Sequence, residues 1–331
     1  MTSMMPRPNG PAKVRQPRPK IGWSVRILAR LLLACVVIEC VLRFALGLGN
    51  PVLIQPDSAC GYVLKPDQDV RRFFVRTHIN HYGMRSDEVQ ETHRKGTLRL
   101  LFVGDSVTYG TTRVDQGKIF TEVLHRELPA IAHQPVEVLN ASAGAWAPSN
   151  ELSYIQSRGI FQSDIVLMVL NDGDLTQPRA SLADVGDNLP RQRPLTAIGE
   201  LYTRYILPRL IRATNRIDSG DTPAADLNSL MRENLENLDK FDASVTAQGA
   251  RLMILYIPFR KDIPDKSNAS AEALHAWSDA HHVAMCDLTS AETPYSSKEI
   301  SLDDGTHLNA RGHLLVARTI EQSWPELAKY Q

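Results

Sequence analysis

Residues 98–110 read LRLLFVGDSVTYG, an almost uninterrupted apolar run that ends in a turn bracketed by Gly104 and Gly110. Apolar runs without polar alternation are typical of strands covered on both faces, as in a parallel sheet. Longer helical stretches separate this run from four others of the same kind, at residues 136–140, 164–170, 251–257 and 283–288. We therefore predict an α/β domain in which a parallel sheet lies between layers of helices.

The composition of the 331-residue chain is that of a globular protein, with 43% hydrophobic and 22% charged residues. Lys plus Arg number 37, as do Asp plus Glu, so no overall charge favours nucleic acid as a partner. The sequence contains no Walker or dinucleotide-binding glycine motif and no histidine or cysteine set with metal-ligand spacing. We expect neither an organic cofactor nor a metal ion.

The N-terminal residues 1–26 are basic and rich in proline, and no acidic residue precedes Glu39. They lead into the apolar segment 27–49, which as a helix rising ~1.5 Å per residue is long enough for a hydrocarbon core of about 30 Å. Glu39 and Arg43 interrupt this segment, but their i, i+4 spacing allows them to pair. An amphipathic or buried helix and a cleaved signal are the alternatives.

We expect residues 27–49 to form a single transmembrane helix that attaches the chain to a membrane. The excess of Lys and Arg before the helix then keeps residues 1–26 in the cytoplasm. Residues 50 onward are expected in the periplasm or outside the cell.

The remainder of the chain divides into two parts. Residues 50–95 are predicted to form a small β-rich segment, in which RRFFVRTHIN (71–80) alternates like one half-buried strand. Residues 96–331 form the main domain, with an insertion at 173–225 that could cover the site as a lid. Within the insertion, Pro208 is expected to kink or break a helix. An apolar stripe follows it and is expected to pack on the core: Leu227, Leu230, Met231, Leu235, Leu238, Phe241 and Val245.

Ser106 lies where chemistry is expected in a parallel sheet. Ligands bind at the carboxyl ends of the strands, where loops meet helix N-termini. A serine in this loop can present its hydroxyl to the crevice, and its backbone N–H can face a developing oxyanion. Gly-Asp-Ser is also ordinary turn chemistry, so this stretch alone leaves both interpretations open.

A serine nucleophile needs a general base, and the base needs a partner that orients it. The stretch SLDDGTHLNARGH (301–313) offers Asp304 and His307 in one loop after the last predicted strand, at a spacing that lets the carboxylate reach the ring. Asp303 is the alternative orienting residue. Asn309 is predicted to cap the closing helix, and His313 to lie on the surface of that helix.

Together, GDSVTYG and DGTH at opposite ends of an α/β pattern resemble the SGNH (GDSL-like) serine hydrolase family, over roughly residues 97–325. The resemblance implies a three-layer, flavodoxin-like fold and a Ser-His-Asp triad. By motif match, Ser106 is the nucleophile, His307 the general base and then acid, and Asp304 the residue that orients His307.

The resemblance also implies an oxyanion hole made by the serine N–H, a glycine N–H and an asparagine side chain. VLNDGD (169–174) places Asn171 at the family's asparagine, although Val169 replaces the glycine usually found two residues earlier. A turn or helix-cap role is the alternative for Asn171. LNASAGAWAPSNEL (139–152) offers Gly144, or Ala145 if the loop is aligned one residue later.

The expected activity is that of a membrane-anchored serine ester hydrolase. Its ester-bearing substrate is a small molecule or a polysaccharide, with O-acyl groups of envelope or exported polysaccharide favoured by the expected location. Two alternatives remain. One is an acyltransferase that uses the same triad, and the other is a catalytically silent carbohydrate-binding or assembly protein.

Overall fold

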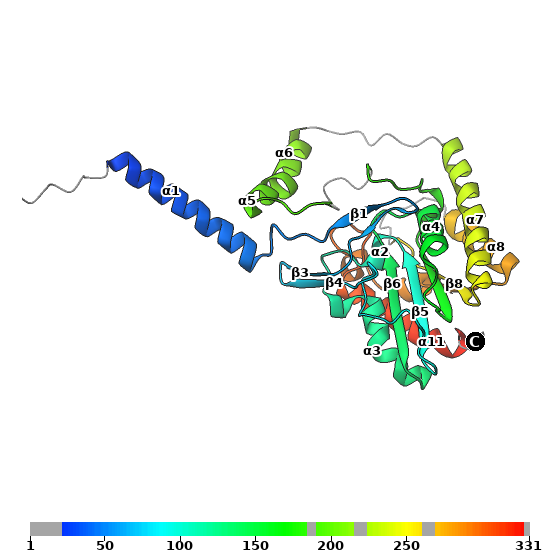
Figure 1. Ribbon diagram of the computed structural model, residues 1–331. Helices are drawn as coiled ribbons and strands as arrows, with labels where there is room; N and C mark the ends of the chain where they lie inside the picture. The colour runs from blue at the N-terminus through cyan, green and yellow to red at the C-terminus, as the bar shows by residue number, and fades with distance from the viewer. Residues whose placement is uncertain (1–21, 184–189, 215–223, 260–268, 328–331) are drawn as a thin grey trace, which may run out of the picture.

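The computed structural model describes residues 22–183, 190–214, 224–259 and 269–327. A sheet of five parallel strands in the order β6-β5-β7-β8-β9 forms its centre (Figure 1). The strands are β5 (Leu98–Gly104), β6 (Val136–Ser142), β7 (Ile165–Leu170), β8 (Arg251–Tyr256) and β9 (Ala284–Asp287). Each of the five predicted apolar runs is thus a strand of one parallel sheet, as expected.

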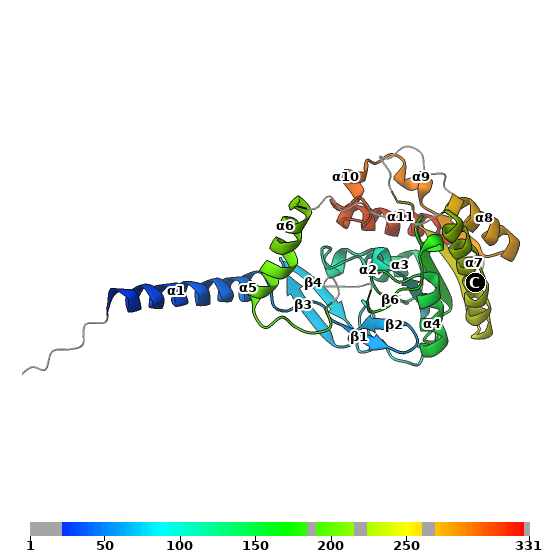
Figure 2. The same cartoon turned by 90° about the horizontal axis from the view of Figure 1, so that it is seen from above.

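Helices cover both faces of this sheet (Figure 2). One face packs against α3 (Phe120–Ala132) and α11 (Ala310–Leu327), through residues such as Phe102 and Phe120. The other face packs against α4 (Pro148–Arg158), α7 (Ala224–Ala247) and α8 (Ala269–His281). The predicted α/β/α layering is therefore confirmed. The predicted stripe on α7 is buried at Leu238, Phe241 and Val245.

The segment before β5 forms two antiparallel hairpins, as its β-rich pattern predicted. The first pairs β1 (Ile54–Asp57) with β2 (Gly61–Leu64), and the second pairs β3 (Gln68–Arg72) with β4 (Val75–Ile79). The prediction of one strand over 71–80 is wrong, because the chain reverses at Phe73 and Phe74. Both residues have left-handed backbone conformations, with φ of 48° and 67°, in a turn without the usual glycine or asparagine.

The prediction of a transmembrane helix over 27–49 is not supported. Helix α1 covers Trp23–Cys40 and continues as a π-helical turn over Val41–Ala45. Within the described part of the chain, no helix is both long and apolar enough to cross a membrane. Arg26, Arg30 and Glu39 all lie within α1 and interrupt its apolar run. The expected location outside the cytoplasm stays a prediction.

Glu39 instead joins α1 to the insertion. Its carboxylate pairs with Arg43 at 2.7 Å, as the spacing predicted, and also accepts the N–H groups of Ala197 (2.8 Å) and Ile198 (3.0 Å). These are the first residues of α5 (Ala197–Glu200), so Glu39 caps that helix. The figures show α5 beside the C-terminal end of α1, which otherwise extends away from the domain (Figures 1 and 2).

The insertion continues from α5 as a π-helical segment, Leu201–Ile206, and then as α6 (Leu207–Thr214). Pro208 therefore does not end the helix. The widened π turn directly before it accommodates a residue that cannot donate a backbone hydrogen bond. The other parts of the predicted insertion, 184–189 and 215–223, lie outside the described residues.

Candidate active site

The order of the strands determines where the site forms. The chain passes from β5 to β6 on one side and then returns to β7 on the other, so β5 lies at the point where the strand order reverses. In open parallel sheets, ligands bind in the crevice at this point, outside the carboxyl ends of the strands. Ser106, the Gly144 turn and Asn171 follow the carboxyl ends of β5, β6 and β7 respectively.

Ser106 is the first residue of the short helix α2 (Ser106–Tyr109). Asp105 caps this helix, because its side chain accepts the N–H of Val107 at 2.8 Å. Only glycine fits at position 104, since a Cβ atom there would lie 2.1 Å from Thr108 Oγ1. The Ser106 N–H belongs to the first turn of the helix and has no carbonyl acceptor within it. It is thus available as a donor beside its own hydroxyl.

The structure brings Ser106, His307 and Asp304 together, although 201 residues separate the serine from the histidine. Ser106 Oγ lies 2.9 Å from His307 Nε2, and His307 Nδ1 lies 3.1 Å from Asp304 Oδ2. These distances correspond to hydrogen bonds on both sides of the imidazole ring. Asp303 pairs with Arg113 instead. The carboxylate that contacts the ring is therefore Asp304.

The pKa of Asp304 is lowered by the loop that carries it. Burial acts to raise this pKa, but the carboxylate accepts the backbone N–H groups of His307 (2.9 Å) and Thr306 (3.1 Å), and the net shift is downward. Asp304 is consequently an anion at neutral pH. A fixed negative charge at this position stabilises an imidazolium at His307.

The loop of His307 does not follow the last strand directly, contrary to the prediction. Two short helices, α9 (Thr289–Glu292) and α10 (Ser297–Ile300), lie between β9 and the loop. A bridge between Ser301 and Leu308 closes the loop at its base. Asn309 then caps α11 as predicted, since its Oδ1 accepts the N–H groups two and three residues later, at 2.8 and 3.1 Å.

Asn171 is buried beside Ser106, and both ends of its amide are held. Its Oδ1 accepts the N–H of Gly173 at 2.8 Å, and its Nδ2 donates to Asp105 Oδ2 at 3.2 Å. Ser106 Oγ lies 3.4 Å from the same Asp105 oxygen. The Asn171 amide nitrogen and the Ser106 hydroxyl oxygen therefore both lie beside the same Asp105 oxygen. The second N–H of Asn171 Nδ2 remains for an oxyanion.

The third predicted donor lies in a tight turn after β6. Gly144 is buried and its carbonyl accepts the Tyr62 hydroxyl at 2.5 Å, so the β1–β2 hairpin fixes the turn. Ala145 is exposed and has a left-handed φ of 64°, and Gln177 Nε2 donates to its carbonyl at 2.7 Å. Both candidates therefore occupy the turn that was expected to provide a backbone N–H.

Three carboxyl groups near the nucleophile are buried, namely Asp105, Glu151 and Asp174, and no sequence pattern predicted a site role for Glu151 or Asp174. Burial raises the pKa of Asp105, and burial together with the charge of Asp105 raises the pKa of Glu151 and Asp174 well above the ordinary range. Asp174 Oδ2 accepts the Asn171 N–H at 2.7 Å. Burial and the like charge of Asp105 therefore both favour the protonated forms of Glu151 and Asp174.

Two arginines were also missed by sequence reasoning. Arg85 is fully buried and donates to the carbonyls of Tyr109 (2.6 Å), Thr111 (2.5 Å) and Val114 (2.7 Å), which fixes the loop after α2. Arg113 Nη1, on that loop, donates to Asp304 Oδ2 at 3.3 Å. No local sequence pattern marks these two arginines. The partners of Arg85 named here are backbone carbonyls, and Asp304, the partner of Arg113, lies 191 residues away.

His313 is buried, so its predicted place on the helix surface is wrong. Its ring stacks on Phe120 with centroids 5.7 Å apart, and its Nδ1 accepts the Phe120 N–H at 3.3 Å. Burial lowers the pKa of His313 to about 3, with the charges of Arg85 and His307 adding to the effect. His313 is therefore neutral and supports the loop beneath Gly110, against which it packs.

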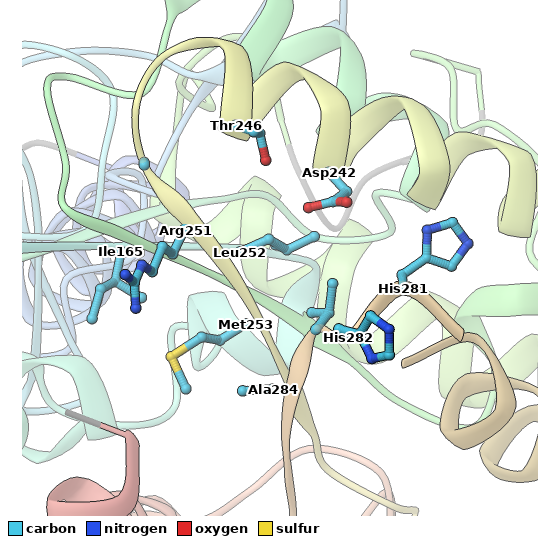
Figure 3. A pocket seen from close by; sticks show the side chains of 11 residues that line it. Ile165, Asp242, Thr246, Arg251, Leu252, Met253, His281, His282 and Ala284 are labelled. Atoms are coloured by element: carbon cyan, nitrogen blue, oxygen red, sulfur yellow. The ribbon is translucent and has the colours of Figure 1, made fainter. Parts of the chain in front are cut away.

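A separate cavity of about 370 Å³ lies at the opposite edge of the sheet (Figure 3). Its walls include Ile165, Arg251 and Ala284, the first residues of β7, β8 and β9. The cavity therefore lies at the amino ends of the parallel strands, whereas Ser106 follows the carboxyl end of β5. The two sites are at opposite ends of the sheet. The candidate active site lies at the carboxyl ends of the strands, around Ser106 and His307.

Of three comparisons with known proteins, only the comparison with solved structures gives matches. No family model matches the chain. A search of curated proteins likewise finds no match. The chain is similar to solved esterases and lipases.

The structure of TesA shares 15% identity and a TM-score of 0.45, covering 70% of this chain and 98% of that one. A catalytic mutant of Axe2, an acetylxylan esterase from Geobacillus stearothermophilus, shares 12% identity and a TM-score of 0.44, covering 70% and 95%. A lipase/acylhydrolase from Enterococcus faecalis shares 17% identity and a TM-score of 0.43, covering 68% and 94%.

Proposed function

We propose that the chain is a serine ester hydrolase of the SGNH type, with Ser106, His307 and Asp304 as its catalytic triad. The observation that carries this proposal is the continuous set of short contacts from Ser106 Oγ through His307 to Asp304, at 2.9 and 3.1 Å. A catalytically silent binding protein has no need of this arrangement. Ser106 follows the carboxyl end of β5, at the strand ends where ligands bind in sheets of this topology.

In the first half of the reaction, Ser106 Oγ attacks the carbonyl carbon of the ester while His307 Nε2 takes the hydroxyl proton. Asp304 stabilises the resulting imidazolium through the Nδ1 hydrogen bond. The negative charge moves to the carbonyl oxygen. The Ser106 N–H, the Asn171 amide and an N–H of the Gly144–Ala145 turn donate to it.

The tetrahedral intermediate then loses the alcohol. His307 gives its proton to the departing oxygen, and the acyl group stays on Ser106. In the second half, a water molecule transfers a proton to His307 and attacks the acyl-serine. His307 then returns this proton to the departing Ser106 Oγ, which releases the carboxylic acid and restores the serine hydroxyl. A sugar hydroxyl in place of water would make the same triad an acyltransferase.

The test is a panel of p-nitrophenyl esters, from acetyl to long acyl chains, with the wild-type chain and Ser106→Ala. We expect turnover by the wild type and a loss of at least about a thousandfold in the variant. Ser58→Ala, an exposed serine on the β1–β2 turn, is the matched control and should retain full activity. Equal rates for wild type and Ser106→Ala would exclude this function, and adding sugar acceptors separates transfer from hydrolysis.

A further inference from the structure

The exposed large hydrophobic side chains gather at one end of the molecule. In the described part of the chain there are nineteen of them, and eighteen lie on three segments. These segments are residues 23–45, which form α1 and its π turn, the tip of the β3–β4 hairpin, and residues 195–210, which include α5 and the start of α6. The nineteenth is Leu314, on α11. Apolar side chains that are concentrated in this way mark an interaction surface.

The three segments contact one another at the C-terminal end of α1. The Phe73 N–H donates to the Leu46 carbonyl at 2.9 Å, which joins the hairpin tip to the end of the π turn. The Phe73 ring meets Tyr205 edge to face, with centroids 5.9 Å apart. The hairpin, α5 and this end of α1 lie at the same end of the domain (Figures 1 and 2). We call the exposed side chains of residues 41–45, 71–74 and 195–210 the end surface.

The helix that runs from α5 to α6 is apolar on two sides. Leu201 and Tyr205 face inward, where they pack against the small cluster around Leu42. A different side carries four exposed residues at intervals of four: Ile198, Tyr202, Ile206 and Leu210. Residues four positions apart lie on the same side of a helix. The inner side holds the helix on the domain, and the outer stripe is left facing solvent.

Unpaired positive charge accompanies these apolar side chains. Four exposed arginines of the three segments pair with no carboxylate of the described residues: Arg26, Arg30, Arg71 and Arg209. The three carboxylates of the same segments each pair with an arginine: Glu39, Asp69 and Glu200. The end surface and the adjoining α1 therefore carry a net positive charge that the described chain does not neutralise.

Two phenylalanines project furthest from the end surface. Phe44 in the π turn is 81% exposed, and Phe74 at the hairpin tip is 74% exposed. Phe74 has a left-handed φ of 67°, which strains a residue with a bulky side chain. Strain of this kind is found where a side chain is held in a place that function requires. Exposed phenylalanines and leucines next to arginines are typical of surfaces that enter the lipid–water interface.

Charge distinguishes between two possible partners. In a symmetric interface, a second copy of the chain would bring the same unpaired arginines towards one another, and like charges repel. An anionic bilayer offers phosphate groups to the arginines and acyl chains to the apolar side chains. A surface that combines exposed apolar side chains with unpaired arginines therefore fits a bilayer better than it fits itself.

We propose that the end surface docks on an anionic lipid bilayer, with Phe44, Phe74 and Leu210 among the acyl chains and Arg71 and Arg209 at the lipid phosphates. This docking holds the domain at the lipid–water interface and requires no helix that crosses the bilayer. It is independent of the proposed hydrolase activity.

The first test is flotation of the full chain with vesicles in a sucrose gradient, because bound protein rises with the vesicles whereas aggregated protein sinks. Binding to vesicles of phosphatidylcholine and phosphatidylglycerol should be at least about tenfold tighter than to phosphatidylcholine alone, and should weaken with added salt. The triple variant Phe44→Gln, Phe74→Asn, Leu210→Gln should bind at least about tenfold more weakly. Leu314→Gln, which removes a comparably exposed leucine from α11, should bind like the wild type.

The arginines are tested separately, since each exposed side chain can be changed without opening the core. Arg71→Gln and Arg209→Gln should each weaken binding to the anionic vesicles about fivefold and leave binding to phosphatidylcholine unchanged. Arg94→Gln is the matched control, because Arg94 is exposed and pairs with no carboxylate of the described chain. Thermal melting shows that each variant is folded.

A second measurement distinguishes docking of the end surface from binding by α1 alone. Trp23 is exposed whereas Trp146, Trp277 and Trp324 are buried, so Trp23→Phe removes the tryptophan that is accessible to lipid. In that background, Phe74→Trp should be quenched by vesicles of brominated lipid, and Leu314→Trp should not. Tyr202→Trp serves as the reporter if Phe74→Trp does not fold.

Three results would overturn the proposal. The first is a wild-type chain that does not float with anionic vesicles. The second is equal binding by the triple variant and the wild type, or equal quenching of the reporters on the end surface and at position 314. The third is a defined dimer in analytical ultracentrifugation that the triple variant abolishes while vesicles have no effect, which would assign the end surface to a second copy of the chain.

Discussion

Glu122, in the first turn of α3, couples the stability of the fold to pH. Its side chain is buried at 9% exposure and accepts a hydrogen bond from Gln116 Nε2 at 3.1 Å. Burial raises its pKa from 4.5 to about 7, and the charge of Asp87 adds to the rise, while Gln116 and Arg85 oppose it. The folded chain therefore holds this proton more tightly than the unfolded chain does.

The sign of the effect follows from that difference. Below the unfolded pKa of 4.5, Glu122 is protonated in both states and contributes nothing that changes with pH. As the pH rises from 4.5 to about 7, the unfolded chain loses the proton first, so the free energy of unfolding falls. Because a difference of one in pKa corresponds to about 1.36 kcal/mol, the rise from 4.5 to about 7 lowers the free energy of unfolding by about 3 kcal/mol.

The assay is urea unfolding of the wild type and Glu122→Gln between pH 4.5 and 8. Glutamine keeps the shape of the protonated acid and cannot ionise. The difference in the free energy of unfolding between the two proteins therefore reports the ionisation of Glu122 and not that of the other buried acids. The two should be about equally stable near pH 4.5. At pH 8 the variant should be more stable by about 3 kcal/mol, and a difference that does not change with pH would refute the reasoning.

Other substitutions test the site and its supports. Asn171→Ala should lower kcat on p-nitrophenyl acetate about 100- to 1000-fold with little change in KM, because one oxyanion donor is lost; an unchanged kcat would remove Asn171 from the oxyanion hole. Arg85→Lys should lower the free energy of unfolding by at least about 3 kcal/mol in urea, since an ammonium cannot reach all the carbonyls that the guanidinium holds; a loss below 1 kcal/mol would contradict this. Phe74→Gly should stabilise the fold by about 1 kcal/mol in the same assay, because glycine adopts a φ of 67° without strain; destabilisation would show that the ring makes a contact that matters more.

The sequence predicted the framework of this fold because its signals are local. The five apolar runs form five parallel strands. Ser106, His307 and Asp304 lie in two short motifs that are far apart in the sequence, and the fold brings these motifs together. The turn at Phe73 and Phe74 was predicted wrongly, and the helix does not end at Pro208, although its form changes from π to α one residue earlier. A π turn accommodates the proline, and the turn contains none of the residues that usually mark one.

The parts that could not be predicted depend on contacts between distant residues. Arg113 reaches Asp304 across 191 positions, and Glu39, which interrupts an apolar run, caps a helix more than 150 residues later. His313 follows the pattern of a helix surface but is buried against Phe120. Burial decides the role of His313, whereas contacts across more than 150 positions decide the roles of Arg113 and Glu39, and a single sequence reports neither.

Covalent labelling with a fluorophosphonate tests the central claim most directly, because the reagent reacts with a serine hydroxyl only when a neighbouring base activates it. Mass spectrometry after digestion should place the label on Ser106 in the wild type. His307→Ala should lose the label while Ser58→Ala keeps it. An absence of label on the folded wild type, or equal labelling of the wild type and Ser106→Ala, would contradict the assignment of Ser106 as the nucleophile.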